Sequence, residues 1–503
     1  MANPDHLRLV FTPEWQAWRQ ENPRLVPDFV EADLRGADLS GKDLTRAVLS
    51  RADLQGANLT GADLTFAQID GIDLDGACLD EANLTNVRFD LLDIRNCSFE
   101  RATLTGATFR GAGLIHARMR GAKLAGVNFE GGMFDLADLS EADFTGASLR
   151  GVRMEGANLT GARFVGANLE GAPLSGCNLT GATLEDAYAV RVQLDGANLR
   201  DARLTKGSFR EANFHQASLE GANFEASDIC HSSFKSANLE NARIVACDAQ
   251  AVDFRDSILL NTEISGSNLA ACQLQNVDFR SPRLGKVTLV RANLSGAILY
   301  RCNLRSFRFE QAKLDGADLR ECNLEAANFE EASLAGTQLR GSRLRQANLR
   351  LVSGVDADLS GCDLILANLR GAVLSRADLR FSKLVGADCR EADFRFADLR
   401  HADLTNAAVS GLKLWGARVG RSRLPLGLLH WKLILGISAW YLASQRRREE
   451  QEARDKQRRI RETVKMVKSL EERDSRLRRT MAVSSRPALN QRARPREEKD
   501  AER

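Results

Sequence analysis

The residues best suited to chemistry in this sequence are ten cysteines and six histidines, because thiolate and imidazole groups act as nucleophiles, bases and metal ligands. The histidines are scattered: His116, His215, His231 and His401 stand far apart, and His6 lies near the start. No HExxH, GxSxG, CxxC or glycine-rich phosphate loop occurs in a suitable context. The sequence therefore predicts no catalytic site, no enzyme and no cofactor.

Most of the cysteines share one regularly spaced position that alanine holds elsewhere in the chain. The seven that do so are Cys97, Cys177, Cys247, Cys272, Cys302, Cys322 and Cys362. A cysteine that replaces alanine in a core is a small buried hydrophobic residue. A metal ladder would need thiolates arranged tetrahedrally around one ion, which this spacing does not offer. We predict no metal site, and reduced cysteines indicate the cytoplasm.

Arginines and aromatic residues in the C-terminal third are the best candidates for binding. One series, at multiples of 20 residues, is Arg320, Arg340, Arg380 and Arg400, and a second is Arg350, Arg370 and Arg390. Phe381, Phe396 and Trp415 are expected to point outward near them. Glutamates lie just before these series, at Glu310, Glu321, Glu325, Glu330 and Glu331. This pattern predicts a contact surface for a protein partner, although alternating charge that only keeps the surface soluble is the alternative.

A period of five residues positions all of these side chains. From Phe29 to Leu424, almost every position whose number ends in 4 or 9 is Leu, Phe, Ile or Met, which gives about 80 repeats without a shift of frame. Two residues earlier the residue is small, usually Ala, and Asp or Asn often stands between them. A period of five fits neither a helix nor an uninterrupted strand. A chain that turns a corner every five residues buries both apolar positions, and four sides make a coil of about 20 residues.

The segments ADLRGADLSGKDL, GANLTGADL and RADLRFSKLVGADCREADFRFADLRHADL resemble the pentapeptide-repeat family. The resemblance covers residues 29–424 and implies an all-β solenoid, a right-handed quadrilateral parallel β-helix of about 20 coils. With a strand spacing of roughly 4.8 Å, such a stack would be on the order of 95 Å long. Some family members protect type II topoisomerases by mimicking DNA, so the resemblance also implies that alternative function.

The ends of the repeats need covers, because an open β-helix exposes backbone groups and core side chains. In residues 1–28, Thr12, Pro13 and Glu14 predict a helix start with Thr12 as N-cap, followed by Trp15 and Trp18 on one face. His6 is expected to precede this helix. We therefore expect an N-terminal capping helix.

The apolar run of residues 424–443 is long enough to cross a bilayer. We assign its residues 425–443, which lie beyond the repeats, to one segment. His430 and Lys432 near its centre disfavour a membrane span. We expect a helix that caps the stack or forms a homodimer contact, with a membrane-interface helix or a membrane span as alternatives. Its candidate contact residues are Leu428, Trp431, Leu435 and Trp440.

Residues 444–483 are predicted to form a charged helix with a weak coiled-coil pattern, and residues 484–503 a disordered basic tail. Residues 425–503 carry 21 basic and 12 acidic groups, so nucleic-acid binding is expected, if anywhere, only through this tail.

The net charge of the repeats helps to choose between a scaffold and a DNA mimic. The whole chain has a net charge of +3, and the repeats are close to −5. Duplex DNA as long as the stack would carry roughly 55 charges. The sequence therefore favours a rigid scaffold that presents its faces to a protein partner, with a DNA mimic and a membrane-tethered rod as alternatives.

Overall fold

The computed structural model describes residues 2–425, 428 and 451. The chain divides into two compact units, Met1–Leu435 and Gly436–Arg503, and almost all described residues belong to the first. The predicted helices and tail within 425–503 therefore lie outside the described residues, apart from single positions. Among the residues that are described, no helix is both long and apolar enough to span a bilayer.

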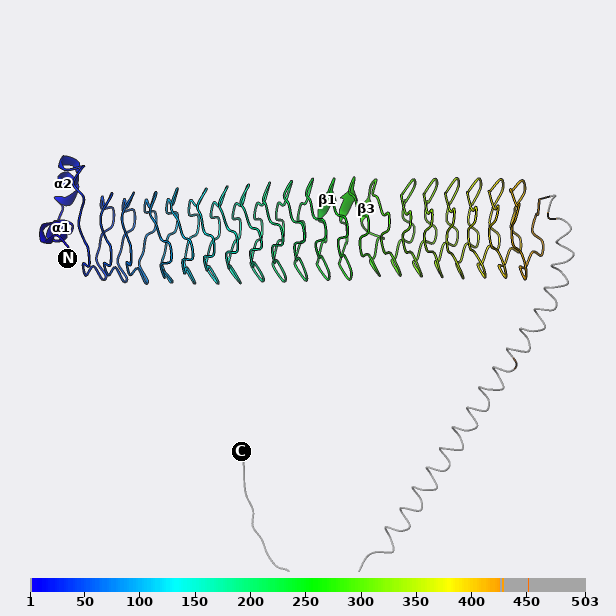
Figure 1. The fold of residues 1–503 in the computed structure, drawn as a ribbon, viewed down its shortest axis with the longest axis horizontal. Helices are drawn as coiled ribbons and strands as arrows, with labels where there is room; N and C mark the ends of the chain where they lie inside the picture. The colour runs from blue at the N-terminus through cyan, green and yellow to red at the C-terminus, as the bar shows by residue number, and fades with distance from the viewer. Residues whose placement is uncertain (1, 426–427, 429–450, 452–503) are drawn as a thin grey trace, which may run out of the picture. The chain divides into compact units, whose positions relative to one another are not determined.

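The N-terminus contains two short helices, α1 (Pro4–Leu9) and α2 (Trp15–Glu21), which lie beside the first coil at the blue end of Figure 1. Trp15 is fully buried, its ring centroid is 5.9 Å from that of Phe29, and its indole N–H donates to the Asp43 carbonyl at 3.0 Å. Helix α2 thus covers apolar side chains of the first coil.

The predicted start of this helix is wrong. Helix α2 begins at Trp15, its N-cap is Glu14, and the Thr12 hydroxyl donates to the Leu9 carbonyl at 2.9 Å instead of capping. Helix α1 was not expected, although Asn3 followed by Pro4 is an N-cap signal, and Asn3 Oδ1 accepts the Asp5 N–H at 2.9 Å. His6 precedes α2, as expected, but belongs to α1, and its Nδ1 accepts the Asp28 N–H at 3.0 Å.

Four-sided coils follow, stacked in parallel along Figure 1. Every bridge pairs a residue with the residue 20 positions later, from Asp28↔Val48 to Asp403↔Arg423. The longer pairings form the strands β1 (Arg243–Val245), β2 (Glu263–Ser265) and β3 (Arg283–Leu284), in the parallel order β1-β2-β3. The predicted quadrilateral β-helix with a 20-residue coil is therefore confirmed.

Each side contributes two inward side chains, one small and one large, and the corner residue adopts a left-handed backbone. Leu34 and Leu39, for example, are 2% and 1% exposed. At the corners Gly36 has φ 60° and Gly41 has φ 61°, a conformation that glycine adopts at little cost. Some corners carry bulky residues in the same conformation, among them Leu351 and Leu366, both at φ 58°. The fold therefore tolerates large side chains at corners, where they point outward.

Backbone pairing is interrupted between residues 67–76 and 87–96. One coil earlier, the N–H groups of Leu49 and Leu54 donate to the carbonyls of Gln68 and Asp73 at 2.7 and 2.8 Å. Among the described residues, the N–H groups of Ile69, Gly71, Leu74 and Gly76 have no such partner one coil later, and no bridge joins Asp73 to Asp93. Asp73 and Asp93 occupy facing positions here, but aspartates also face each other across the intact bridges Asp33↔Asp53 and Asp53↔Asp73, so like charge alone does not open this side.

A second interruption lies on one side between residues 281–286 and 301–306. Leu304 N–H donates to the Asn323 carbonyl at 2.8 Å, but one coil earlier Leu284 N–H has no partner on Asn303 within the described residues. Pro282 stands where alanine is usual, and Leu284 is only partly buried. Both interruptions weaken the stack locally.

Candidate interaction surface

The first arginine series lies on one corner of the β-helix, which we call the ridge. It consists of Tyr300, Arg301, Arg320, Glu321, Arg340, Gly341, Ser360, Gly361, Arg380, Phe381, Arg400, His401 and Arg421. Backbone hydrogen bonds join its successive levels, from Arg301 N–H to the Arg320 carbonyl at 3.0 Å to Phe381 N–H on the Arg400 carbonyl at 3.2 Å. The ridge is therefore a rigid column with levels about 4.8 Å apart.

Three of the six ridge arginines are held by an aspartate two residues earlier. Arg320, Arg380 and Arg400 contact Asp318, Asp378 and Asp398 at 2.7, 2.6 and 2.6 Å. Both Nε and a terminal nitrogen of each guanidinium donate to the carboxylate. These hydrogen bonds hold the pKa of Asp318 below its usual range. The ridge therefore carries much less free positive charge than its arginine count implies.

The second arginine series lies ten residues further round each coil, on the diagonally opposite corner. Arg370 pairs with Glu391 at 2.9 Å, Arg390 pairs with Asp388 at 2.6 Å, and Arg350 pairs with Glu330. Four of the five glutamates that precede the arginine series are likewise bound to nearby arginines, as in the Arg301–Glu321 pair at 2.7 Å, and Glu331 accepts from Gln311 Nε2 at 2.8 Å. The two arginine series thus belong to different faces, and neither faces a free acidic patch.

The aromatic residues also divide between corners. Phe381 lies on the ridge and stacks on His401, with ring centroids 4.7 Å apart and planes 6° from parallel. Phe396 and Trp415 pack edge to face at 4.8 Å on the neighbouring corner. Trp415 also lines a groove of 370 Å³ with Leu412, Leu414 and the buried Leu428. Trp431, Leu435 and Trp440, predicted beside Leu428 as dimer or membrane contacts, lie outside the described residues.

Arg340 differs from the other ridge arginines. Within residues 2–425 its guanidinium has no hydrogen-bond or ion-pair partner, although Arg345 in the same coil pairs with Asp363 at 2.7 Å. It lines a hollow of 330 Å³ together with Tyr300, Arg320, Glu321 and Gly341. The Tyr300 ring is contacted by the guanidinium groups of Arg301 and Arg320 at 4.9 and 5.5 Å. Tyr300 and His401 were not among the predicted residues, although their 20-residue spacing from the arginine series marks this corner.

The inward cysteine thiols are buried and hydrogen-bonded to backbone carbonyls. Burial raises the pKa of the Cys97, Cys177 and Cys362 thiols to about 12. Each thiol donates to a backbone carbonyl 23 residues earlier, as Cys97 does to Leu74 at 2.9 Å. A thiol in this state is neither a nucleophile nor a metal ligand. Cys302, beside the second interruption, is the one member of the predicted seven that is only partly buried.

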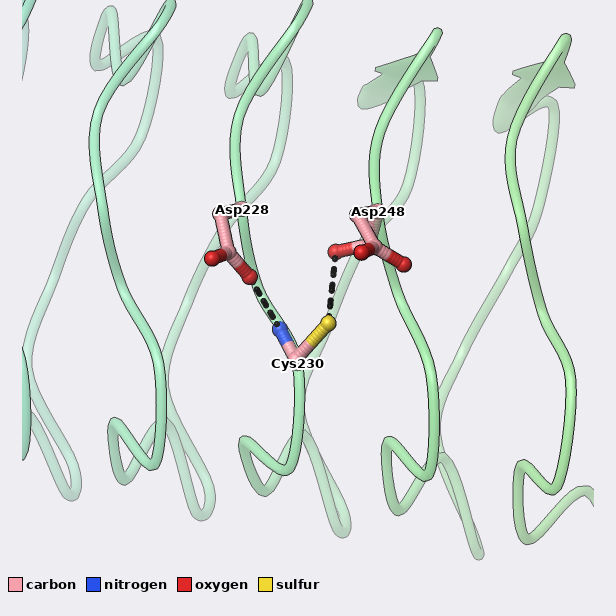
Figure 2. A group of neighbouring side chains, drawn as sticks. All are labelled: Asp228, Cys230 and Asp248. Carbon is pink, nitrogen blue, oxygen red and sulfur yellow. Dashed lines mark hydrogen bonds between the residues drawn. The ribbon is translucent and has the colours of Figure 1, made fainter.

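Cys230 lies between two aspartates, as Figure 2 shows, and this group has the composition of a metal site. Burial raises the pKa of its thiol to about 12, and its Sγ is 3.6 Å from the Asp248 backbone carbonyl. Asp228 already pairs with Arg210 at 3.0 Å. A protonated thiol and an ion-paired carboxylate do not form a zinc site, so we assign no metal to this group.

Family models identify the family to which this fold belongs. A family model described as pentapeptide repeats matches residues 28–65, 67–131, 137–176 and 272–411, more than half of the chain. The chain belongs to the pentapeptide-repeat family. A second model, described as a pentapeptide repeat region, matches residues 157–234. The right-handed quadrilateral β-helix of the pentapeptide-repeat proteins is therefore the fold of this chain.

Solved pentapeptide-repeat structures resemble only parts of the chain. A trypsin-treated form of QnrB1, a plasmid-mediated fluoroquinolone resistance protein, is 24% identical, with 42% of this chain and 89% of that chain covered and a TM-score of 0.24. HetL from Nostoc sp. strain PCC 7120, involved in heterocyst differentiation regulation, is 23% identical over 63% and 90%, with a TM-score of 0.15. A protein from the Arabidopsis thaliana thylakoid lumen is 28% identical over 24% and 69%, with a TM-score of 0.10. Curated proteins gave no match. We transfer no residue-level role from these structures.

Proposed function

We propose that this chain is a non-enzymatic scaffold that binds a protein partner along the ridge. The observation that carries the proposal is the combination of the exposed Phe381 ring, clamped arginines and Arg340, which has no ion-pair partner within residues 2–425, on a corner whose backbone is fixed by hydrogen bonds. Aromatic and arginine side chains dominate the binding energy of protein interfaces. Arginines already held in place by aspartates lose little side-chain entropy on binding, which favours affinity.

The ridge suits a protein better than an enzyme substrate. Five of its charged groups, Arg301, Arg320, Glu321, Arg380 and Arg400, are held in ion pairs, and burial raises the pKa of the Cys362 thiol to about 12. A catalytic site needs convergent groups with free acid, base or nucleophile function. These side chains are better suited to an extended contact with another protein than to catalysis.

Quantitative capture of partners from cells that contain the protein tests the proposal. The bait is the full chain, compared with a ridge variant (Arg340→Glu, Phe381→Ala and Arg421→Glu) and with an opposite-corner variant (Arg350→Glu, Arg370→Glu and Arg390→Glu). We expect a specific protein to bind the wild type and the opposite-corner variant and to be lost from the ridge variant. Equal capture by all three baits would show that the ridge is not the surface that binds the partner.

One observation favours a second function, DNA mimicry directed at a type II topoisomerase. Residues 28–81 contain twelve acidic and four basic residues, a net charge of −8. These residues make just under three coils, or roughly 13 Å of stack, and duplex DNA of that length carries roughly 8 charges. A gyrase supercoiling assay tests this alternative: inhibition or protection at stoichiometric amounts, abolished by Asp33→Asn, Asp53→Asn and Asp73→Asn together, would support it over the ridge.

A membrane-tethered rod and a homodimer through residues 424–443 remain predictions from the sequence. Cell fractionation tests the first, because carbonate-resistant membrane retention would require a tether. Analytical ultracentrifugation of the full chain against a chain ending at residue 425 tests the second.

A further inference from the structure

The Phe381 ring has one face stacked on His401 and a second face that no corner side chain covers. The corner position one coil earlier is Gly361, and the position before that is Gly341. A Cβ atom added to Gly361 would lie 4.0 Å from its nearest neighbour, the Gly341 backbone nitrogen. Phe381 is consequently 60% exposed, although its backbone is held in the stack. A space the height of one aromatic ring therefore adjoins Phe381.

This space lies between Phe381 and the hollow that contains Arg340. The hollow is lined by Arg340 and Gly341 at its near end and by Tyr300, Arg320 and Glu321 at its far end. A ring stacked on Phe381 would sit at the level of Gly361, one coil spacing of about 4.8 Å from the level of Arg340. An anion attached to that ring would reach the guanidinium.

Within residues 2–425, Arg340, unlike its neighbours Arg320 and Arg380, has no acidic side chain paired with it. Arg320 and Arg380 each donate to their own aspartate, at 2.7 and 2.6 Å, whereas Arg340 has Gln338 at the aspartate position. Lys383 and Arg421, beside Phe381 and His401, also lack a carboxylate partner within residues 2–425. The positive charge left unpaired on the ridge is thus concentrated on both sides of the open ring face.

We propose that the ridge binds a segment of a partner protein that carries an aromatic side chain and a carboxylate two residues apart. The aromatic ring stacks on Phe381 over Gly361, and the carboxylate pairs with Arg340. In an extended segment, side chains two residues apart project on the same side about 6.7 Å from each other, which matches the offset between the two subsites to within a few ångströms. This inference rests on the proposed function and specifies its partner.

A nucleic acid fits this surface less well. Asp318, Asp378 and Asp398, which clamp ridge arginines, form a column beside the ridge together with Asp358. A polymer with a phosphate at every unit would meet this column repeatedly, whereas a peptide needs only one carboxylate at Arg340. Single-strand binding is therefore the competing outcome that the experiment must separate.

Fluorescence anisotropy with the full chain and a defined probe tests the proposal. The probe is a fluorescein-labelled twelve-residue peptide with one tryptophan and one glutamate two residues before it in a serine–glycine background. We expect saturable binding that weakens at least about 10-fold for Arg340→Ala and for Phe381→Ala, as expected for interface hot spots. The same probe with glutamine in place of glutamate should bind wild type and Arg340→Ala equally, because the two changes remove one interaction.

Matched variants distinguish loss of the space beside Phe381 from a general effect on the fold. Gly361→Leu is expected to abolish binding by covering the free face of Phe381, and leucine is tolerated at this corner position in Leu351 and Leu366. Gly151→Leu makes the same change on another corner, with no atom within 4 Å of the added Cβ, and should leave binding unchanged. Arg390→Ala removes a clamped arginine from the opposite corner and should also bind normally.

Three results would overturn the proposal: no saturable binding by wild type up to 1 mM peptide, undiminished binding by Gly361→Leu, or tighter binding of a twelve-residue oligothymidine that depends on Arg340. Partner capture distinguishes this failure from failure of the proposed function. If a specific protein is still lost from the ridge variant while the peptide does not bind, the ridge remains an interface and only the acidic–aromatic motif is wrong.

Discussion

Replacing Asp93 with asparagine should close part of the first interruption in the β-helix. At this position of the repeat, asparagine pairs with the aspartate one coil earlier: Asn58 Nδ2 donates to Asp38 Oδ1 at 3.1 Å and Asn158 Nδ2 to Asp138 Oδ1 at 2.9 Å. Asp93→Asn removes the like charge opposite Asp73 and supplies the same donor. The exposed ion pair between Asp93 and Arg95 is lost, but such pairs contribute little in water.

The expected gain follows from the backbone bonds that the regular side makes. Closing this side would restore bonds from the N–H groups of Leu74, Gly76 and residue 93, which correspond to Leu54, Gly56 and Asp73 one coil earlier. At about 0.5–1.5 kcal/mol each, these bonds would raise the cost of local opening by about 1.5–4.5 kcal/mol. Amide hydrogen exchange at Leu74 and Gly76 should therefore slow by roughly 10- to 1,000-fold.

Hydrogen exchange followed by mass spectrometry or NMR measures this directly. Leu54 and Gly56, already bonded to Asp73 and Asp75 at 2.8 and 2.9 Å, serve as internal controls and should be protected in both proteins. If Leu74 and Gly76 are already as protected as Leu54 and Gly56 in the wild type, the interruption does not exist. If Asp93→Asn leaves their exchange unchanged, the asparagine side-chain donor does not close this side.

Further predictions concern the cap, the second interruption and the buried thiols. Trp15→Ala should cost about 3–5 kcal/mol and expose the first coils before the rest, as measured by urea unfolding and exchange mapping. Within the repeats, trypsin should cut after Arg283 or Lys286 earlier than after Arg343, which holds the equivalent position on an unbroken side. Mass spectrometry of the early fragments would identify the site. Because the Cys97 thiol stays protonated up to a pKa of about 12 while an unfolded thiol ionises near pH 8.5, the unfolded state gains stability as pH rises above about 8.5. The melting temperature should therefore fall from pH 8.5 toward 12, and less steeply in Cys97→Ala; a parallel fall in both proteins would contradict this assignment.

The period of five residues was sufficient to predict the coil, its inward positions and the burial of most cysteines. An apolar stripe of that period has one way to be buried, so the fold follows from the pattern. The helix boundaries did not follow, because Thr12 has a competing local acceptor in the Leu9 carbonyl, and side chain to backbone bonds of this kind displace caps.

The candidate site was predictable only in outline. The 20-residue spacing of the arginines located the ridge, but the aspartate two residues before an arginine neutralises it, and this signal was present in every Ala-Asp-Leu-Arg repeat. Arg340 is distinguished by Gln338 in place of that aspartate. The stacking of Phe381 on His401 depends on two residues 20 apart adopting the same corner conformation, which composition alone does not reveal.

The central claim is that the ridge is the surface that holds a protein partner. The most direct test is a hydroxyl-radical footprint of the full chain with and without the partner purified from the capture experiment. The account predicts that protection concentrates on Tyr300, Phe381, His401 and their neighbours along that corner, with Leu351 on the opposite corner unchanged. Protection confined to the acidic coils of residues 28–81, or to residues beyond 425, would contradict it.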